Sequence, residues 1–315
     1  FEKFISNYLV ADKDVGLCLS AGLDSKLIKH LMLKKKKINS FSIGFKDQTY
    51  DETRFIRSEK RNNNKKKILV KKNFKEIFYR FKKNIYFPFG DSSVIPTVGL
   101  FDLVKKRTNV SISGDGGDEI FFGYEAFRGF YLSLFIKKII PNFLLSILKS
   151  PFKRIEIPNQ YLSFKKKLKF FFNNINYESF MLNNLWISNF GENEVNSYFK
   201  KNKKQKNKFL LKIESLFTRS KDKMKFSQLY FIKFYLPVIL MKVDFSSMLN
   251  SVENRAPYLN KSLLNFSIDL ESKKNFRLLT NRYMMKNMFR NYLIDKSEIK
   301  KHGFAFDKYI LLKNK

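Results

Sequence analysis

The sequence predicts an α/β fold, in which a doubly wound, mostly parallel sheet is followed by a mostly helical C-terminal region. Three observations support this class. Short apolar runs alternate with helical patterns before Gly123, two of these runs end in loops of small or acidic residues, and Phe/Leu/Lys-rich stretches with few glycines fill the remainder. Strands that alternate with helices favour a parallel sheet, which binds ligands at the carboxyl ends of its strands.

Apolar periodicity places the elements of the sheet region in chain order. A short run of apolar residues indicates a strand, and apolar residues three or four positions apart indicate a helix. The lysine-rich segments Asn62–Lys67 and Lys200–Lys208 are expected to be solvated loops or helix faces. We expect strands at Val15–Leu19, Ile38–Phe45, Ile68–Val70 and Val110–Ser113, and helices at Lys26–Leu33, Lys75–Asn84 and Val98–Lys106.

The charge balance of the chain is strongly basic. It has 62 basic and 28 acidic residues, so its net charge is 62 − 28 = +34. Such a charge can favour nucleic acid or another anionic partner, which usually meets a clustered basic patch. Here the lysines are spread along the chain, and Lys, Asn, Ile, Phe and Tyr are enriched together, as AT-rich coding produces. We therefore favour coding bias over nucleic-acid binding as the source of the charge.

Cysteine content and hydropathy bear on the compartment. Cys18 is the single cysteine, so the chain has no internal disulfide or zinc cluster, and the cytoplasm is the expected location. The most apolar stretch, Phe130–Leu148, is interrupted by Lys137, Lys138 and Pro141. It therefore lacks the ~20 apolar residues that a membrane span requires. We expect two short buried helices there and no membrane partner.

The first candidate site is the segment Ser20–Ser25, which joins the first expected strand to the first expected helix. Small residues allow backbone N–H groups to approach an anion, and the start of a helix adds its positive dipole end. A phosphate site is one interpretation. An ordinary turn capped by Ser or Asp is the other. The Gly-Lys-Ser/Thr ending of a Walker loop is absent.

The second candidate site is the acidic loop at Ser113–Glu119, which directly follows another apolar strand. Its three carboxylates, on Asp115, Asp118 and Glu119, suit Mg²⁺ bridged to phosphates. An acidic surface turn is the alternative. We favour the metal site because both loops follow strands that are expected to be neighbours, where open sheets bind their ligands.

Both loops resemble motifs of one enzyme family. Ser20–Ser25 resembles the pyrophosphate-binding loop Ser-Gly-Gly-x-Asp-Ser of ATP pyrophosphatase-type enzymes. Ser113–Tyr124 resembles the asparagine synthetase signature Ser-Gly-Asp-Gly-Gly-Asp-Glu-x-Phe-x-Gly-Tyr. The resemblance implies an adenine nucleotide alpha hydrolase-like core at 1–125 and a helical extension at 126–315. It covers most of residues 1–307, because further similar segments follow in the family's order at Ser42–Phe45, Tyr50–Glu52, Asp91–Thr97, Tyr235–Leu259 and Lys301–Phe304.

The resemblance also implies roles for individual residues, with ATP and Mg²⁺ as cofactors. Asp24 and Asp118 are the implied Mg²⁺ ligands. Asp115 is implied to position or deprotonate the incoming ammonia, and Lys301 to neutralise charge on the α-phosphate. The residues implied to contact the pyrophosphate of ATP and its surroundings are Ser20, Ala21, Gly22, Asp24, Ser25 and Ser113. Those implied to lie against the nucleoside are Gly44 and Gly114.

The activity implied by the resemblance is ATP-dependent amidation of a carboxylate. The carboxylate forms an acyl-adenylate with release of pyrophosphate, and ammonia then displaces AMP. A small-molecule carboxylate is the expected partner, and aspartate, which becomes asparagine, is the default. Three alternatives stay open: an amidotransferase for a sugar or peptide precursor, a tRNA-modifying pyrophosphate-loop ligase, and an inactive nucleotide-binding scaffold.

Several positions depart from the family pattern. Ala21 replaces the usual first glycine of the pyrophosphate loop, and we expect tolerance if its φ is negative. Phe245 stands where arginine is common, and Asn260 where aspartate is common. The chain opens at Phe1, close to the start of the synthetase domain, without the glutaminase domain and its cysteine nucleophile. We expect a fragment, or an enzyme that uses free ammonia or a partner's glutaminase. A homodimer is a further open alternative.

Overall fold

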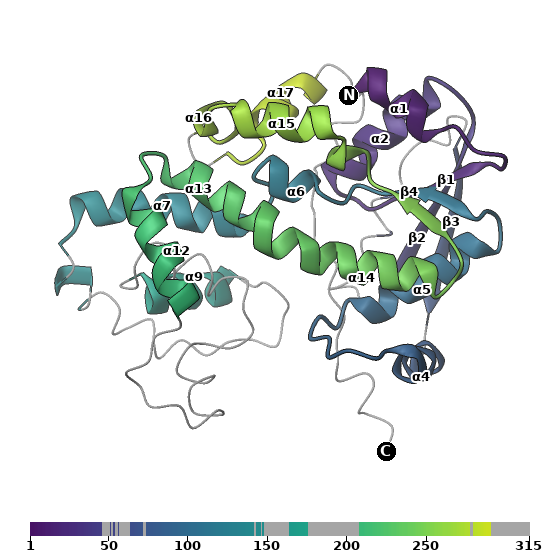
Figure 1. The fold of residues 1–315 in the computed structure, drawn as a ribbon, viewed down its shortest axis with the longest axis horizontal. Coiled ribbons are helices and arrows are strands. Elements are labelled where there is room, and N and C mark those ends of the chain that lie inside the picture. The colour runs from purple at the N-terminus through teal and green to yellow at the C-terminus, as the bar shows by residue number, and fades with distance from the viewer. Residues whose placement is uncertain are drawn as a thin grey trace. The chain divides into compact units, whose positions relative to one another are not determined.

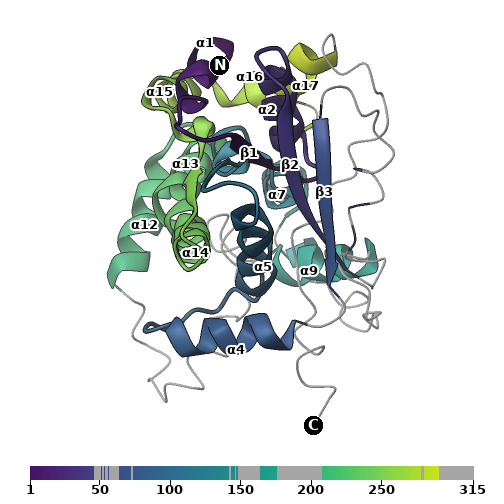
Figure 2. The same ribbon diagram turned by 90° about the vertical axis from the view of Figure 1, so that its right-hand side faces the viewer.

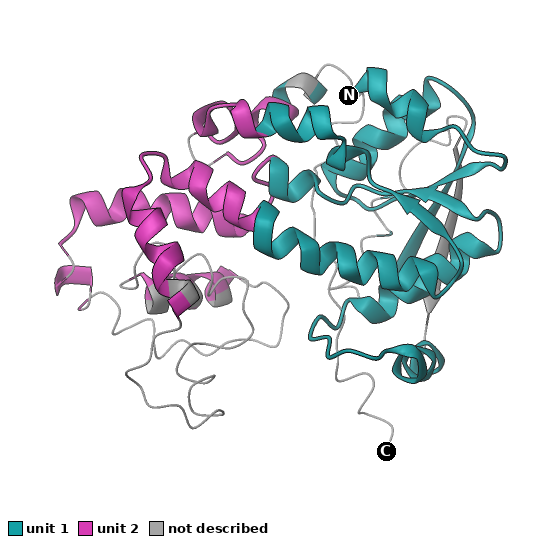
Figure 3. Ribbon diagram, in the orientation of Figure 1, with its two compact units in different colours: residues 1–120, 232–267, 286–315 teal, residues 121–231, 268–285 magenta. Residues whose placement is uncertain are grey.

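The structure of the chain is a computed structural model (Figure 1). It describes two compact units, unit 1 (residues 1–120, 232–267 and 286–315) and unit 2 (residues 121–231 and 268–285), which Figure 3 colours separately. The described residues within them are 1–45, 51, 53, 56, 64–71, 74–141, 143–145, 147, 164–175, 208–277 and 280–290. The units are interleaved along the chain, and a domain boundary at residue 125 stays a prediction.

Unit 1 is built on a five-stranded sheet in which every pair of neighbours is parallel. Its strand order is β3-β2-β1-β4-β5, so the chain moves outward from β1 on one side before it crosses to β4 on the other. This arrangement confirms the predicted α/β class with a doubly wound parallel sheet. The strands are β1 (Val15–Cys18), β2 (Ile38–Phe45), β3 (Asn64–Lys71), β4 (Val110–Ile112) and β5 (Glu253–Arg255).

Helices cover the sheet of unit 1. Crossovers between parallel strands are right-handed, so α2, which links β1 to β2, and α5, which leads back to β4, belong on opposite faces. Figure 2 shows α5 and α14 on the same side of β2 and β3. The helices of this unit are α1 (Glu2–Tyr8), α2 (Leu23–Leu33), α4 (Lys75–Asn84), α5 (Val94–Lys105), α6 (Gly117–Ile120) and α14 (Leu236–Met248), with the 3₁₀ turn η2 (Pro257–Leu259).

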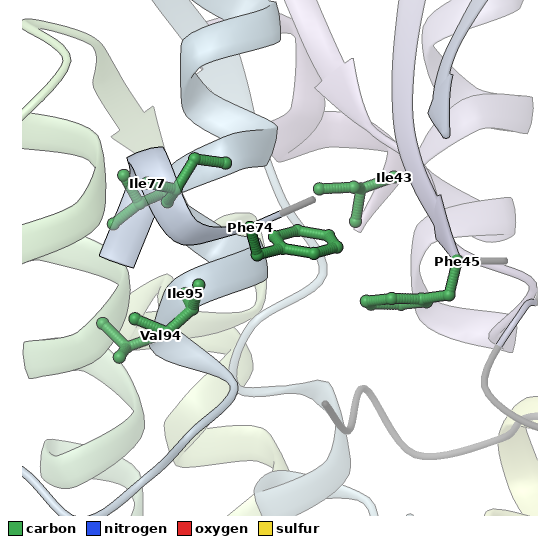
Figure 4. Close-up of a cluster of buried hydrophobic side chains, with 7 residues drawn as sticks. Ile43, Phe45, Phe74, Ile77, Val94 and Ile95 are labelled. Carbon is green, nitrogen blue, oxygen red and sulfur yellow. The ribbon is translucent and has the colours of Figure 1, made fainter. Parts of the chain in front are cut away.

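One apolar core of unit 1 lies between β2 and the helices α4 and α5. Ile43 and Phe45 of β2 are buried with Phe74, and the Phe45 and Phe74 rings stack with centroids 5.7 Å apart (Figure 4). The methyl groups of Val94 and Ile95, at the start of α5, close the same cluster. Burial of this apolar area, at roughly 25 cal/mol per Å², is the main force that holds α4 and α5 to the sheet.

Unit 2 is helical in the described part of the chain. The rings of Phe122, Phe127 and Phe231 pack in sequence, with centroid distances of 5.0 and 4.5 Å. Asp222 caps α13 by accepting a hydrogen bond from Lys225 N at 2.8 Å. Its helices are α7 (Glu125–Ile139), α9 (Phe164–Asn174), α12 (Lys208–Arg219), α13 (Lys223–Tyr230) and α16 (Ser272–Asn275), while η1 (Phe231–Tyr235), α15 (Lys261–Asp269) and α17 (Tyr283–Arg290) contain residues of both units.

The structure corrects three expectations. β5 was not predicted, because a strand of three residues at the edge of the sheet carries no apolar run. The segment Asn62–Lys67 is not simply a solvated loop, since β3 begins at Asn64 and forms the other edge, where lysines are common. The stretch Phe130–Leu148 is helical over most of its described residues but only partly buried: Phe130 and Leu145 are 1% exposed, whereas Ile139 is 64% and Ile147 is 65% exposed.

One helical stretch of the described residues has the length and composition of a membrane span. Lys223–Met248 has 26 residues and a mean hydropathy of 1.3, and 28% of its apolar window is buried. Core helices of soluble proteins meet the same criterion. Within unit 1, Lys242 of this stretch is buried and pairs with Asp91, with Nζ to Oδ2 at 3.0 Å. This contact belongs to a packed core, so the stretch is weak support for a span.

Candidate active site

The two candidate loops lie at the carboxyl edge of the sheet, at its topological switch point. β1 is flanked by β2 on one side and β4 on the other. Leu17 pairs with Ile112, so β1 and β4 end at the same level and the loops after them begin side by side. Open α/β sheets bind ligands at this place, because the two neighbouring connections leave in opposite directions and open a crevice.

Hydroxyl groups fold the first loop on itself. Ser20 N donates to Ser25 Oγ at 3.1 Å, and the two hydroxyl oxygens lie 3.0 Å apart. Ser25 Oγ also lies within hydrogen-bonding distance of the carbonyls of Ser20 and Gly22, at 3.0 and 3.2 Å. Gly22 is the N-cap of α2, so the loop runs directly into the positive end of an 11-residue helix. This is the local geometry of an anion site.

Ala21 is compatible with this loop. It is 1% exposed, and it is not among the described non-glycine residues with positive φ. The methyl group therefore adds no backbone strain, and its tolerance beside a bound phosphate stays a prediction.

The acidic loop packs directly against the start of α2. A Cβ built on Gly114 would lie 3.1 Å from Asp24 Cβ, and one built on Gly117 would lie 2.7 Å from Asp24 Oδ1. The second distance is too short for any side chain, so Gly117 is required for the Asp24 carboxylate to lie where it does. Gly116 has a φ of +89°, a conformation that L residues rarely adopt. The loops, nearly ninety residues apart in sequence, are therefore in contact.

The segment after β5 supports both loops. Tyr258 is 1% exposed, and its hydroxyl donates to the Asp24 carbonyl at 3.3 Å. Burial, reinforced by the charge of Asp24, raises the pKa of Tyr258 well above its ordinary value, so the phenol keeps its proton. Leu259 packs against the backbone of Gly116. Arg255 donates to the carbonyls of Tyr8 and Val10 at 2.9 and 2.7 Å, which secures the segment before β1.

Cys18 lies at the end of β1 and is buried. Burial, helped by the charge of Asp115, raises the pKa of its thiol to about 12. The thiolate is the nucleophilic form of cysteine, so this thiol is unreactive at neutral pH. Cys18 therefore has a structural position beneath the loops.

Other expected site residues are placed differently. Gly44, near the end of β2, lies against protein atoms: an added Cβ would meet Asp51 Oδ1 and Thr53 Cγ2, each at 2.8 Å. Asp51 accepts hydrogen bonds from the backbone and hydroxyl of Thr53. Gly114 likewise lies against α2. Lys301 is outside the described residues, so the structure does not place it.

The carboxylates suit a nucleotide-bound magnesium ion. Among the residues that the structure describes, no group of three or more His, Cys, Asp and Glu side chains forms a metal site by itself. Nucleotide-bound Mg²⁺ does not need one, because one or two carboxylates combine with phosphate oxygens and waters. Asp24 Oδ1 lies against Gly117, the residue before Asp118. The Asp24 carboxylate, with the backbone next to Asp118 against it, fits a donor set of one or two carboxylates.

The structure shows two polar contacts to which the sequence interpretation assigned no role. Lys242 donates to Asp91 and, at 2.8 Å, to the hydroxyl of Ser93 before α5. Asn254 of β5 donates to the hydroxyl of Ser113 at 2.8 Å. Both residues lie in the segment Tyr235–Leu259 that resembles the family, but their partners, about 140 or more positions away, could not be read from the sequence.

Comparisons with known proteins identify the family of the chain. The family model described as asparagine synthase matches residues 1–305. The chain is 35% identical over 140 residues to a "putative asparagine synthetase (glutamine-hydrolyzing) 2" of Methanocaldococcus jannaschii, which covers 42% of the chain and 27% of the relative. It is 22% identical over 291 residues to asparagine synthetase (glutamine-hydrolyzing) 1 of Bacillus subtilis, which covers 90% of the chain and 44% of the relative.

The matched regions therefore span less than half the length of these two relatives. The family match, by contrast, covers nearly the whole chain and includes both loops. The chain belongs to the asparagine synthase family.

Proposed function

We propose that this chain catalyses ATP-dependent amidation of a carboxylate. In this reaction the carboxylate attacks the α-phosphate of ATP, pyrophosphate leaves, and ammonia displaces AMP from the acyl-adenylate. The default substrate is aspartate, which becomes asparagine. The family membership supports a carbon–nitrogen ligase in general, and the substrate and the adenylate mechanism are the specific content of this proposal.

The contact between the two loops carries the proposal. Gly117 has no side chain, and its backbone lies against the Asp24 carboxylate at the start of α2. This contact puts an anion-binding helix start beside a carboxylate loop at the switch point of the sheet. A triphosphate with its metal ion needs both kinds of group at once, because backbone donors bind the phosphates and carboxylates bind the cation.

Each expected residue has a chemical role in the proposal. Backbone and hydroxyl groups of the Ser20–Ser25 loop bind the pyrophosphate portion of ATP. Asp24 and Asp118 hold Mg²⁺, which neutralises phosphate charge when bound. Asp115 orients the ammonia or takes its proton, and Lys301 stabilises charge at the α-phosphate. The nucleoside would meet Gly44 and Gly114 through their backbone, because protein atoms already fill the space that a side chain would take at either glycine.

Pyrophosphate release tests the proposal. The chain is incubated with ATP, Mg²⁺, ammonia and a panel of carboxylates that includes aspartate, a sugar acid and a peptide acid. Aspartate-dependent release of pyrophosphate and AMP, with formation of asparagine, is the expected result. Release with another acid redefines the substrate. Release only with tRNA indicates a tRNA-modifying ligase, and ATP binding without any release indicates an inactive scaffold.

Asp24→Asn gives a sharper test of the metal site. The variant keeps the shape of the side chain and loses its charge, so we expect pyrophosphate release to fall by at least about 10³-fold while the thermal unfolding midpoint stays within a few degrees. Full activity in Asp24→Asn would remove this residue from the metal site.

The proposal also covers the source of the ammonia, the compartment in which the protein acts and its partners. The relatives are described as glutamine-hydrolyzing and extend beyond the matched region. We propose that a glutaminase domain or subunit supplies ammonia to this region, and that the protein acts in the cytoplasm without a nucleic-acid partner. The assay above supplies free ammonia, so the test does not require the glutaminase. Sedimentation analysis of the same preparation tests a homodimer.

A further inference from the structure

A chain of hydrogen bonds leads from the interior of the sheet to Asp115. Ser111 of β4 and Asn254 of β5 are paired across the two strands, and Ser111 Oγ donates to Asn254 Oδ1 at 3.0 Å. Asn254 Nδ2 donates to Ser113 Oγ at 2.8 Å, and Ser113 Oγ donates to Asp115 Oδ2 at 2.5 Å. Ser111 is fully buried and Ser113 is 6% exposed, so water competes little for these bonds.

The direction of these hydrogen bonds follows from the carboxylate. An ionised carboxylate only accepts, so Ser113 must use its single proton for Asp115. Ser113 Oγ can then only accept from Asn254, which must present its amide nitrogen and leave its oxygen for Ser111. The amide is therefore the group that stops Ser113 from turning its proton away from Asp115. A hydrogen bond to a charged acceptor is stronger and more directional than a neutral one.

We propose that Asn254 is a positioning residue for amide formation, because it orients the Ser113 hydroxyl that holds the Asp115 carboxylate. The inference rests on the proposed function, in which Asp115 meets the ammonia. The inference also predicts which half of the reaction a substitution of Asn254 slows. Adenylate formation precedes the entry of ammonia, so the loss in an Asn254 variant should fall mainly on the second half of the reaction.

The backbone around Asn254 does not depend on its side chain. Ser113 N donates to the Arg255 carbonyl at 2.9 Å, and β4 and β5 are paired through three residues each. A side-chain substitution at 254 therefore keeps the strand pair and the entry into the acidic loop. Residue 254 is partly exposed, so an alanine there leaves no sealed cavity.

The test compares the two half-reactions in Asn254→Ala and Asn254→Asp. The first half is measured as carboxylate-dependent ATP–pyrophosphate exchange without ammonia, and the second as ammonia-dependent amide formation. We expect exchange within about twofold of wild type and a fall of about tenfold in kcat/KM for ammonia in Asn254→Ala, equivalent to one oriented hydrogen bond. Asn254→Asp should fall further, because it accepts the Ser113 proton and withdraws it from Asp115.

Asn84→Ala is the matched control. Asn84 donates a hydrogen bond to the Arg80 carbonyl at 2.7 Å on the exposed end of α4, and this variant should leave both half-reactions unchanged. Equal losses in both half-reactions of Asn254→Ala indicate a structural role and overturn the proposal. Unchanged kinetics with ammonia in both Asn254 variants overturn it as well.

A double-mutant cycle, measured by thermal unfolding, tests these hydrogen bonds without an activity assay. If Asn254 orients Ser113, the double variant Asn254→Ala/Ser113→Ala loses less in Tm than the sum of the two single variants. Additive losses overturn the proposal. If the wild-type chain shows no carboxylate-dependent exchange with any acid, the proposed function fails, and the unfolding cycle still decides whether Asn254 holds Ser113.

Discussion

Two regions of unit 1 hold their side chains in different ways. At the carboxyl edge of the sheet, the loops at 20–25 and 113–119 use glycines and hydroxyls, and the Asp24 carboxylate lies against the backbone of Gly117. Against α14, the rings of Phe81 and Phe87 pack edgewise onto Phe245, with centroids 5.7 and 5.9 Å away. The first region is polar and defined by close contacts. The second, which we call the aromatic region, is defined by ring packing.

The two regions differ in how well they tolerate substitutions. The energies of hydrogen bonds and of close atomic contacts change steeply over tenths of an ångström, so an added atom in the loops must displace its neighbours. Ring packing depends mostly on area and volume, so the aromatic region accepts replacements of similar size. The aromatic region, Met241 and Lys242 line a small gap. This gap has no room for a water molecule, and none of the expected site residues lines it. Phe245, which stands where the family commonly has arginine, packs here against the rings of Phe81 and Phe87.

The largest loss of activity is expected from a substitution in the loops. Gly117→Ala would bring a methyl group to 2.7 Å from Asp24 Oδ1 and displace the carboxylate. We expect pyrophosphate release to fall by about 10²-fold or more, since a displacement near 1 Å has that consequence in an active site. Steady-state kinetics with ATP and aspartate measure the loss.

Gly90→Ala is the control for this prediction, because nothing lies within 4 Å of a Cβ at that glycine. Its activity should match wild type. An active Gly117→Ala variant would mean that Asp24 can move without consequence, and the contrast between the two regions would disappear.

The next effect concerns the ion pair beside the aromatic region. The Lys242 side chain is 11% exposed and Asp91 is 34% exposed. Removal of one partner of a buried pair costs about 3–5 kcal/mol, and because Asp91 is partly exposed we expect about 2–3 kcal/mol for Asp91→Asn. Urea unfolding measures the change. Asp102→Asn, which breaks the more exposed pair with Arg80, should cost under about 1 kcal/mol.

This ion pair also has a predicted pH dependence. Burial alone would raise the pKa of Asp91, but the Lys242 ammonium and hydrogen bonds with Ser93 and Lys242 lower it below its ordinary value of 3.8. A lowered folded-state pKa means that the stabilisation is complete above pH 3.8 and is lost as the pH falls through the folded value. The gap in unfolding free energy between wild type and Asp91→Asn should therefore close below pH 3.8. A constant gap would contradict this cause.

The smallest effect is expected within the aromatic region itself. Phe245→Ala removes a half-buried ring and should cost about 1–2 kcal/mol, less than the ~3–5 kcal/mol of a fully buried phenylalanine. Phe245→Leu should recover most of that loss, because it keeps apolar volume. ATP affinity should stay the same in both variants. A large loss of ATP binding in Phe245→Leu would show that the ring acts on the site and not only on packing.

The sequence was most informative where structure is local. The strand Ile38–Phe45 and the helix Lys75–Asn84 have the bounds that apolar periodicity predicted. The loop Ser20–Ser25 could be recognised because its small residues, its serines and its position before a helix are adjacent in the chain. β5 could not, since Glu253–Arg255 becomes a strand only through its partner β4.

The sequence by itself determined the fold class, the two loops and the family, because each is written in short runs of neighbouring residues. Only the tertiary structure decided that Gly117 meets Asp24, that Lys242 is buried against Asp91, and that Asn254 lies beside Ser113. The physical reason is the range of the interactions. Propensity and capping act within a few residues, whereas these contacts depend on strand order and helix packing, which bring together groups separated by about ninety to one hundred and fifty positions.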